Sequence, residues 1–148
     1  MRFGRLLGLI PVLILCIAAG ASQQPPQRLH GTSETPEQQQ RAMQAVNAVR
    51  IINTAELNYH SQKGSYASLE ELGASSGMEK VLKMMPRWSE VYQAMSFAPG
   101  KDILPGFEAR LTTSGDKYTI FIVDKTDPSR WSLYSDQEGL IYVGEVMR

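Results

Sequence analysis

The chain has 148 residues, and its 15 Lys and Arg balance 15 Asp and Glu, so the formal net charge is 0. This length suits one domain with a hydrophobic core and is too short for two ordinary domains. A neutral chain lacks the positive field that attracts nucleic acid, so we expect no nucleic-acid partner. Its single cysteine, Cys16, lies in an early apolar stretch, which leaves the remainder without disulfide or thiolate chemistry.

The first 21 residues have the parts of a bacterial-type secretory signal peptide: basic Arg2 and Arg5, an apolar stretch over 6–18, and small residues up to Ala21. We expect cleavage after Ala21 and a periplasmic or secreted product. An uncleaved anchor is the alternative, but a membrane-spanning helix needs about 20 apolar residues and this stretch is shorter. A membrane partner is therefore expected only if this segment is retained.

Lipidation of Cys16 is a second alternative for the same segment. Lipoprotein processing prefers a small residue before the modified cysteine, and here Leu15 precedes it. We therefore interpret Cys16 as an apolar residue that leaves with the signal.

Residues 22–40 are rich in Pro, Gln, Ser and Thr and contain Leu29 as their only large aliphatic residue. Such a composition cannot bury enough apolar surface to offset chain entropy, so we expect a flexible tether. A helix is predicted over 36–62, with Thr35 as N-cap, Pro36 in the first turn and Gly64 as the stop. Its apolar residues recur every three or four positions: Ala42, Ala45, Val46, Val49, Ile52 and Leu57, broadened by Ile51 and Ala55.

Short helices are predicted after the long one. Ser68 and Glu71 have the spacing of a capping box. Apolar residues also recur at helical spacing over 78–95, interrupted by Pro86, which indicates two short helices that meet at the proline.

The last forty residues change to the period of strands. β-branched and aromatic residues are concentrated or alternate over 107–112, 118–123, 131–134 and 140–143, with turn residues between them. Short connections make consecutive strands antiparallel neighbours, which predicts a four-stranded meander. The fold class expected is α+β: one long N-terminal helix packed on a C-terminal antiparallel meander, with short helices between, in one domain over 41–148.

Two patterns resemble the globular part of type IV pilins and pseudopilins, notably the short pilins of acidobacterial and deltaproteobacterial type. The first is Ile-Asn-Thr-Ala-Glu at 52–56, then Tyr59 and Gly-Ser-Tyr-Ala-Ser-Leu-Glu-Glu-Leu-Gly at 64–73. The second is Tyr-Ser-Asp-Gln-Glu-Gly-Leu-Ile-Tyr at 134–142. The likeness covers roughly residues 42–143, with 78–105 matching poorly, and implies a pilin-like fold.

The beginning of the chain departs from that family. A prepilin signal has an apolar residue after the glycine at the cut and Glu at the fifth position of an unbroken apolar helix. Here Arg5 follows Gly4, the fifth position is Leu9, and Pro11 interrupts the run. We therefore expect a pilin-like head without the helix that forms filaments.

No catalytic motif stands out. The two histidines, His30 and His60, lack metal-ligand spacing, and no serine lies in a nucleophile motif. Glu56 lies near the apolar side of the long helix, where a lone carboxylate is costly, so we expect it to accept hydrogen bonds from the following turn or from the sheet. The sequence predicts no enzyme and no cofactor.

Asp124, Asp127 and Asp136 are weak candidates for calcium ligands, because we expect them in loops at one end of the sheet. The alternative is that they are solvated turn residues.

Met85, Trp88, Tyr92 and Met95 are candidates for a protein-interaction surface, because dense methionines and aromatics can form an adaptable contact. The alternative is that they are core. The leading functional hypothesis is a non-enzymatic extracytoplasmic protein that acts by protein contact, as an accessory to a type IV pilus or type II secretion system. The alternative hypothesis is a small secreted module that binds a ligand or calcium.

Overall fold

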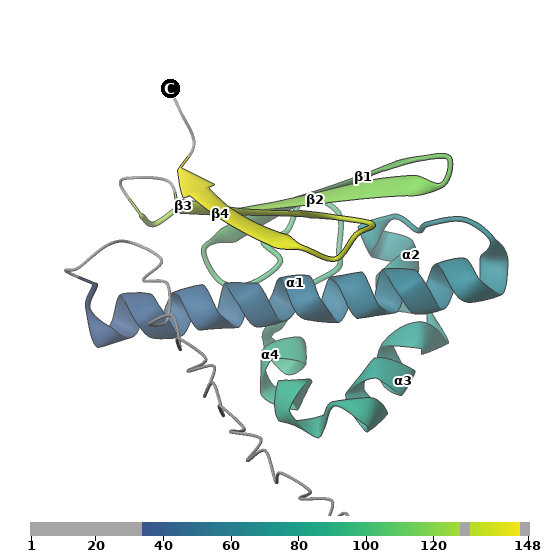
Figure 1. Ribbon diagram of the computed structural model, residues 1–148. Helices are drawn as coiled ribbons and strands as arrows, with labels where there is room; N and C mark the ends of the chain where they lie inside the picture. Colours follow the sequence, from purple (N-terminus) through teal and green to yellow (C-terminus); the bar gives the residue numbers. More distant parts are fainter. Residues whose placement is uncertain (1–33, 128–130, 146–148) are drawn as a thin grey trace, which may run out of the picture.

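The computed structural model describes residues 34–127 and 131–145 (Figure 1). The expected signal peptide, residues 1–21, and residues 22–33 of the expected tether lie outside the described residues. The elements in chain order are α1 (Pro36–Lys63), α2 (Leu69–Ala74), α3 (Ser76–Met84), a 3-10 turn η1 (Pro86–Trp88), α4 (Ser89–Ala94), β1 (Phe107–Ser114), β2 (Lys117–Asp124), β3 (Trp131–Asp136) and β4 (Ile141–Glu145). The expected α+β class is confirmed.

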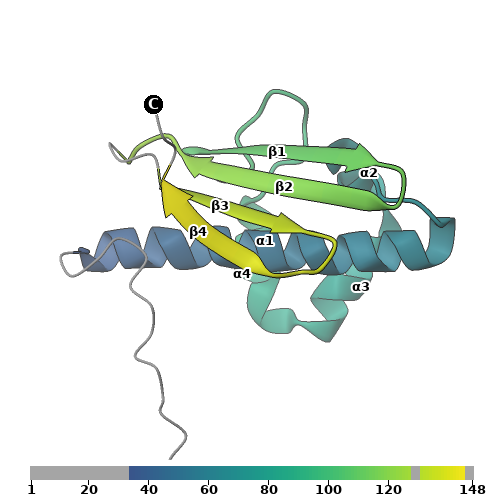
Figure 2. The same ribbon diagram turned by 45° about the horizontal axis from the view of Figure 1, so that its top comes forward.

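The sheet is a four-stranded antiparallel meander in the order β1-β2-β3-β4, as the short connections predict. One register row crosses all four strands and joins Arg110, Phe121, Tyr134 and Tyr142. Side chains alternate between the faces of a sheet, so this row lies on one face and Ile120, Leu133 and Ile141 lie on the other. The helices cover only that second face (Figures 1 and 2).

The helix expected over 36–62 is present as α1, and its ends have the predicted chemistry. The side chain of Thr35 accepts a hydrogen bond from the backbone of Gln38, whose side chain accepts one from the backbone of Thr35. Gly64 ends the helix at φ 74°, where a β-carbon would cost energy. The boundary of the expected tether is corrected, because residues 36–40 are the first turns of α1: the capping box starts the helix before its apolar face begins.

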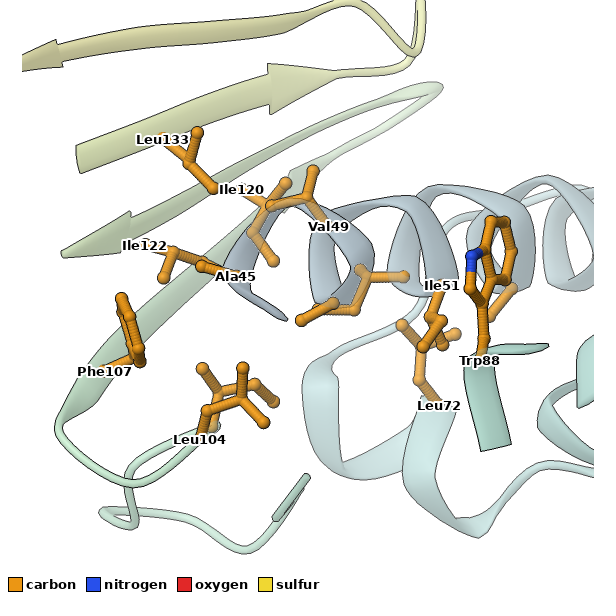
Figure 3. Packing of buried hydrophobic residues seen from close by; sticks show 14 of the residues in the cluster. Ala45, Val49, Ile51, Leu72, Trp88, Leu104, Phe107, Ile120, Ile122 and Leu133 are labelled. Atoms are coloured by element: carbon orange, nitrogen blue, oxygen red, sulfur yellow. The ribbon is translucent and has the colours of Figure 1, made fainter. Parts of the chain in front are cut away.

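α1 forms a middle layer between the sheet on one side and α3 and α4 on the other (Figure 1). Ala45 and Val49 point toward the sheet, whereas Ile51 points toward Leu72 and Trp88 (Figure 3). The core therefore has two halves that share one helix, and the broad apolar face of α1 serves both. Leu57, expected in the apolar stripe, is instead 54% exposed, because it lies on the side of the helix that neither layer covers.

The short helices also follow the prediction. Ser68 and Glu71 form the expected capping box of α2, and Pro86 separates α3 from η1 and α4. A β-carbon on Gly73 would lie 2.4 Å from the β-carbon of Phe97, so glycine is what allows α2 to approach the chain after α4. Among the residues that the structure describes, no helix is both long and apolar enough to cross a bilayer.

Candidate functional site

Two groups of polar side chains join α1 to the sheet, and they are the most prominent polar features of the described chain. The first, which we name the Arg41 clamp, consists of Arg41, Asp124 and Thr126. The second, which we name the buried polar cluster, consists of Asn53, Glu56, Tyr118 and Ser135.

The Arg41 clamp lies where the first turns of α1 meet the end of β2. The guanidinium donates from Nη2 to Oδ1 of Asp124 at 2.9 Å and from Nε to Oδ2 at 3.3 Å. Its Nη2 also donates to the hydroxyl of Thr126 at 3.0 Å, and its plane lies over the ring of Phe107, 4.6 Å from the centroid. The guanidinium is thus fully engaged in fastening the helix to the β2–β3 turn.

Asp124 is buried, and its carboxylate accepts hydrogen bonds from Thr126 as well as from the guanidinium of Arg41. Its Oδ1 accepts hydrogen bonds from the backbone N–H of Thr126 at 2.8 Å and from the Thr126 hydroxyl at 2.6 Å. Burial alone would raise the pKa of Asp124, but the bonds from Arg41 and Thr126 outweigh burial and hold the pKa below its usual value. The carboxylate is therefore charged at neutral pH and already satisfied.

The buried polar cluster lies between the second half of α1 and the middle of the sheet. The amide of Asn53 donates to the hydroxyl of Ser135 at 2.8 Å, and its oxygen accepts from the hydroxyl of Tyr118 at 3.0 Å. Asn53 thereby links β2 to β3 through the helix. Burial raises the pKa of Tyr118, and the nearby carboxylate of Glu56 raises it further, so the phenol stays protonated.

Glu56 is fully buried one turn after Asn53. Its Oε2 accepts a hydrogen bond from the backbone N–H of Ala67 at 3.0 Å, while Oε1 has no hydrogen-bond partner among the described residues. Burial raises the pKa of Glu56 to about 7; the Ala67 bond lowers the pKa, and the charge of Glu71 raises it. The expected role of Glu56, as an acceptor for the turn after the helix, is confirmed.

Aromatic rings close this cluster off. The ring of Tyr66 lies 4.7 Å from that of Tyr118 and 4.5 Å from that of His60, between centroids. His60 is thus a stacked, partly exposed residue at the end of α1. His30 lies outside the described residues.

The three calcium candidates do not share a site, which corrects the expectation that they lie at one end of the sheet. Asp124 ends β2, and Asp136 is paired with Thr119 near the start of that strand, about 17 Å away at the usual rise per residue. Successive turns of a meander alternate between its two ends, so the β2–β3 and β3–β4 turns lie apart. Asp127 follows Asp124, and Asp136 accepts a hydrogen bond from the backbone N–H of Glu138 at 2.9 Å.

The four interaction candidates belong to the layer of helices under α1. Trp88 is buried in the core, and the other three, Met85, Tyr92 and Met95, are half-buried against it. Of the two readings of this stretch, burial favours core, because an aromatic already packed against α1 cannot also cover a partner. Within this stretch the exposed methionine is Met84, at 59%.

Two hollows among the described residues are both small. One cleft of about 230 Å³ lies between α2, the chain over 96–103 and β1, and is lined mainly by apolar groups such as Leu69, Phe97 and Ile103. A hollow of about 110 Å³ lies beside the Arg41 clamp. Pockets for small molecules usually enclose roughly 300–1,000 Å³, so neither has the size of such a site. Acidic, histidine and cysteine side chains gather nowhere in the described chain into a group of three that could bind a metal ion.

Several large apolar side chains that are exposed lie elsewhere, along the β3–β4 hairpin. Tyr134, Leu140, Tyr142 and Val143 are 38%, 54%, 52% and 44% exposed. The rings of Tyr134 and Tyr142 lie 6.0 Å apart between centroids. Sequence reasoning identified these residues only as strand formers, because alternation alone does not show that a strand lies at an edge.

Comparisons with protein-family models, with curated proteins and with solved structures gave no match. The residues themselves are therefore the basis for any functional argument. Sequence reasoning did not identify Arg41 and Asn53 as polar anchors. The available signal was that Asn53 and Glu56 are polar residues three positions apart beside an apolar stripe, a spacing that places both on one side of a helix.

Proposed function

We propose that this chain is a non-enzymatic extracytoplasmic protein with a pilin-like head, which acts by contact with protein components of a type IV pilus or type II secretion system. The observation that carries the proposal is the arrangement of α1 against one face of a four-stranded meander, with short helices between them. The resemblance of residues 52–73 and 134–142 to pilins implies the same order of elements. Fold and role are separable, so the role needs its own test.

The polar groups of the described chain support contact rather than catalysis. Arg41 and Asn53 are hydrogen-bonded to side chains of the sheet and of the turn after β2, and Glu56 accepts a bond from the backbone of Ala67 through one of its two oxygens. A catalytic group must instead present a reactive atom to a substrate within hydrogen-bond reach. The exposed apolar hairpin over β3 and β4 is, in contrast, a surface that another protein can cover.

The first test concerns export. Intact-mass measurement of the protein made from the full-length chain in its source organism should give a species that begins at Ser22, in the periplasmic or secreted fraction. A full-length species in the cytoplasm would contradict the extracytoplasmic part of the proposal. A species that carries lipid on Cys16 would replace the soluble product by an anchored one.

The second test concerns the partner. In-cell cross-linking followed by mass spectrometry should connect lysines of the head, such as Lys117 and Lys125, to pilin, pseudopilin or secretion-platform proteins. The matched control is residues 1–35 fused to an unrelated domain, which should lose those links. Links that persist in the control, or that join only proteins unconnected with pili and secretion, would overturn the proposed role.

The second candidate function, a ligand-binding or calcium-binding module, has no specific observation in its favour, because the cleft is small and the aspartates are separated. Millimolar calcium should leave the melting temperature unchanged. A calcium-dependent rise that Asp127→Asn removes would favour the second candidate.

A further inference from the structure

β4 is an edge strand whose free side has no backbone partner among the residues that the structure describes (Figure 2). Edge strands are templates for further pairing, and proteins usually protect them with charges, proline or bulges. The opposite edge, β1, carries the ion pair between Arg110 and Glu108, 2.9 Å long. β4 has no proline, and its charged residue is Glu145 at its very end. The centre of this edge is therefore less protected than that of β1.

The alternation of the ladder shows which backbone groups are free. The N–H of Lys125 donates to the carbonyl of Gly106 at 2.9 Å, which makes this pair a hydrogen-bonded one. Hydrogen-bonded and non-hydrogen-bonded pairs alternate along antiparallel strands, and the registers are continuous. When this alternation is continued from β1 to β4, the N–H and C=O groups of Tyr142 point toward β3. Those of Ile141 and Val143 point toward the free edge.

We propose that β4 pairs antiparallel with β4 of a second copy of this chain, about a two-fold axis at Tyr142, to form one continuous sheet of two heads. In this register Ile141 of each copy pairs with Val143 of the other, and their free N–H and C=O groups satisfy each other. Tyr142 lies opposite its own equivalent in a non-hydrogen-bonded pair, where side chains approach most closely.

The side chains fit this register. Leu140, 54% exposed, falls opposite Gly144, and a β-carbon built on Gly144 has no atom within 4 Å, so there is room for the leucine. Val143, 44% exposed although it points to the helix side, would be covered by Ile141 of the other copy. The aromatic row Phe121, Tyr134, Tyr142 would continue into the same row of the second head.

The charges and the buried area at the edge determine how strongly two copies associate. From Leu140 to Gly144 no charged side chain enters the proposed pairing, and Glu145 falls opposite Gly139 at its end, whereas β1 would bring Glu108 and Arg110 to its edge. A five-residue strand buries less than the roughly 1,000 Å² typical of stable interfaces, so the dimer is weak and concentration-dependent. This inference does not depend on the proposed function.

Sedimentation equilibrium of protein made from the full-length chain should show a monomer–dimer equilibrium. Val143→Lys places a charge on the pairing edge and should weaken association at least about tenfold. Leu57→Lys, a change at an exposed apolar side chain on α1 (54%, against 44% for Val143), should leave association unchanged. A wild-type protein that stays monomeric up to about 1 mM, or a folded Val143→Lys variant that dimerises as well as wild type, would overturn the proposal.

Cross-linking tests the register without relying on a destabilising change. In a Cys16→Ser background, Tyr142→Cys should form an intermolecular disulfide under mild oxidation, because the axis places the two residues side by side. Leu57→Cys should not. If Tyr142→Cys links no faster than Leu57→Cys, the symmetric pairing of β4 is wrong, whatever the fold stability of the lysine variant.

Discussion

The Arg41 clamp and the buried polar cluster fasten the two halves of α1 to the same sheet by different chemistry. In the clamp, near solvent, a carboxylate keeps its charge because a guanidinium compensates for it. In the buried polar cluster, Glu56 faces no cation that the structure shows, and its pKa rises instead. A carboxylate between a helix and a sheet can thus be compensated by a cation or neutralised by a proton. The two arrangements respond differently to pH and salt.

Asn53→Ala should give the largest effect and would break the buried polar cluster. It leaves the hydroxyls of Tyr118 and Ser135 without the partner that the structure shows, and we expect the free energy of unfolding to fall by about 2–4 kcal/mol. Chemical denaturation measures this change. Asn47→Ala removes an amide bonded to the exposed Arg50, and it should cost under about 0.5 kcal/mol. Equal losses in both variants would mean that the buried polar cluster stabilises the fold no more than an exposed hydrogen bond does.

Glu56 and Asp124 should change the free energy of unfolding with pH in opposite directions. The pKa of Glu56 rises from an unfolded value of 4.5 to about 7 in the fold, so the folded state binds more protons between these values. The free energy of unfolding should therefore fall as pH rises from 4.5 to 7, by about 1–3 kcal/mol, and stay level above 7. Asp124 acts oppositely, since its lowered pKa adds stability that is lost when pH falls below its usual value.

Glu56→Gln is the matched control for that pH profile. Gln cannot titrate, and its side-chain oxygen can still accept from the N–H of Ala67, so the fall between pH 4.5 and 7 should disappear. If the variant keeps the same slope, another group is responsible and the assignment to Glu56 is wrong. Thermal unfolding at half-unit pH steps resolves the two curves.

Arg41→Ala should have a smaller effect, about 1–2 kcal/mol, because Thr126 still donates two bonds to Asp124. Arg110→Ala removes an ion pair whose side chains are 77% and 40% exposed, so it should cost under about 0.5 kcal/mol. In the background of Asp124→Asn, the loss on removing Arg41 should shrink. An undiminished loss would show that Arg41 acts through its contact with the ring of Phe107 instead.

Salt should give the smallest effect and sharpen the same contrast. Between 0.1 and 1 M NaCl the Debye length falls from about 10 to about 3 Å, so the stabilisation lost in Arg41→Ala should decrease by under about 0.5 kcal/mol. The stability lost in Asn53→Ala should not change with salt, because Asn53 is uncharged and buried. Denaturation with urea, which adds no ions, makes the measurement clean.

Local chemistry explains the parts that were predicted well. Thr35 with Pro36 and Gly64 fix the ends of α1, and Ser68 with Glu71 begins α2, because caps involve residues within one turn of each other. The strands fall within one or two residues of their expected bounds for the same reason, since alternation and turn residues are read over short windows. The order of strands then follows from short connections alone.

Apart from the tether boundary, the errors and the alternatives left open concern which residues meet across the chain. Leu57 has the right spacing for the apolar stripe but faces solvent. The three aspartates are close in sequence, but the meander sends Asp136 to the opposite end from Asp124. Trp88 lies in a stretch that suits either a surface or a core, and the layer of helices under α1 makes it core.

Caps, periodicity and loop length, all readable from the amino acids, are enough to specify the secondary structure, the α+β class and the meander. The burial of α1 on two sides, the contact between Arg41 and Asp124 across 83 positions, and the bonds from Asn53 to Tyr118 and Ser135 appear only in the folded chain. A polar residue in an apolar stripe indicates that a hydrogen-bond partner is needed, but it does not indicate which residue that partner is. The partner is fixed by the register of the sheet and by where the helix crosses it.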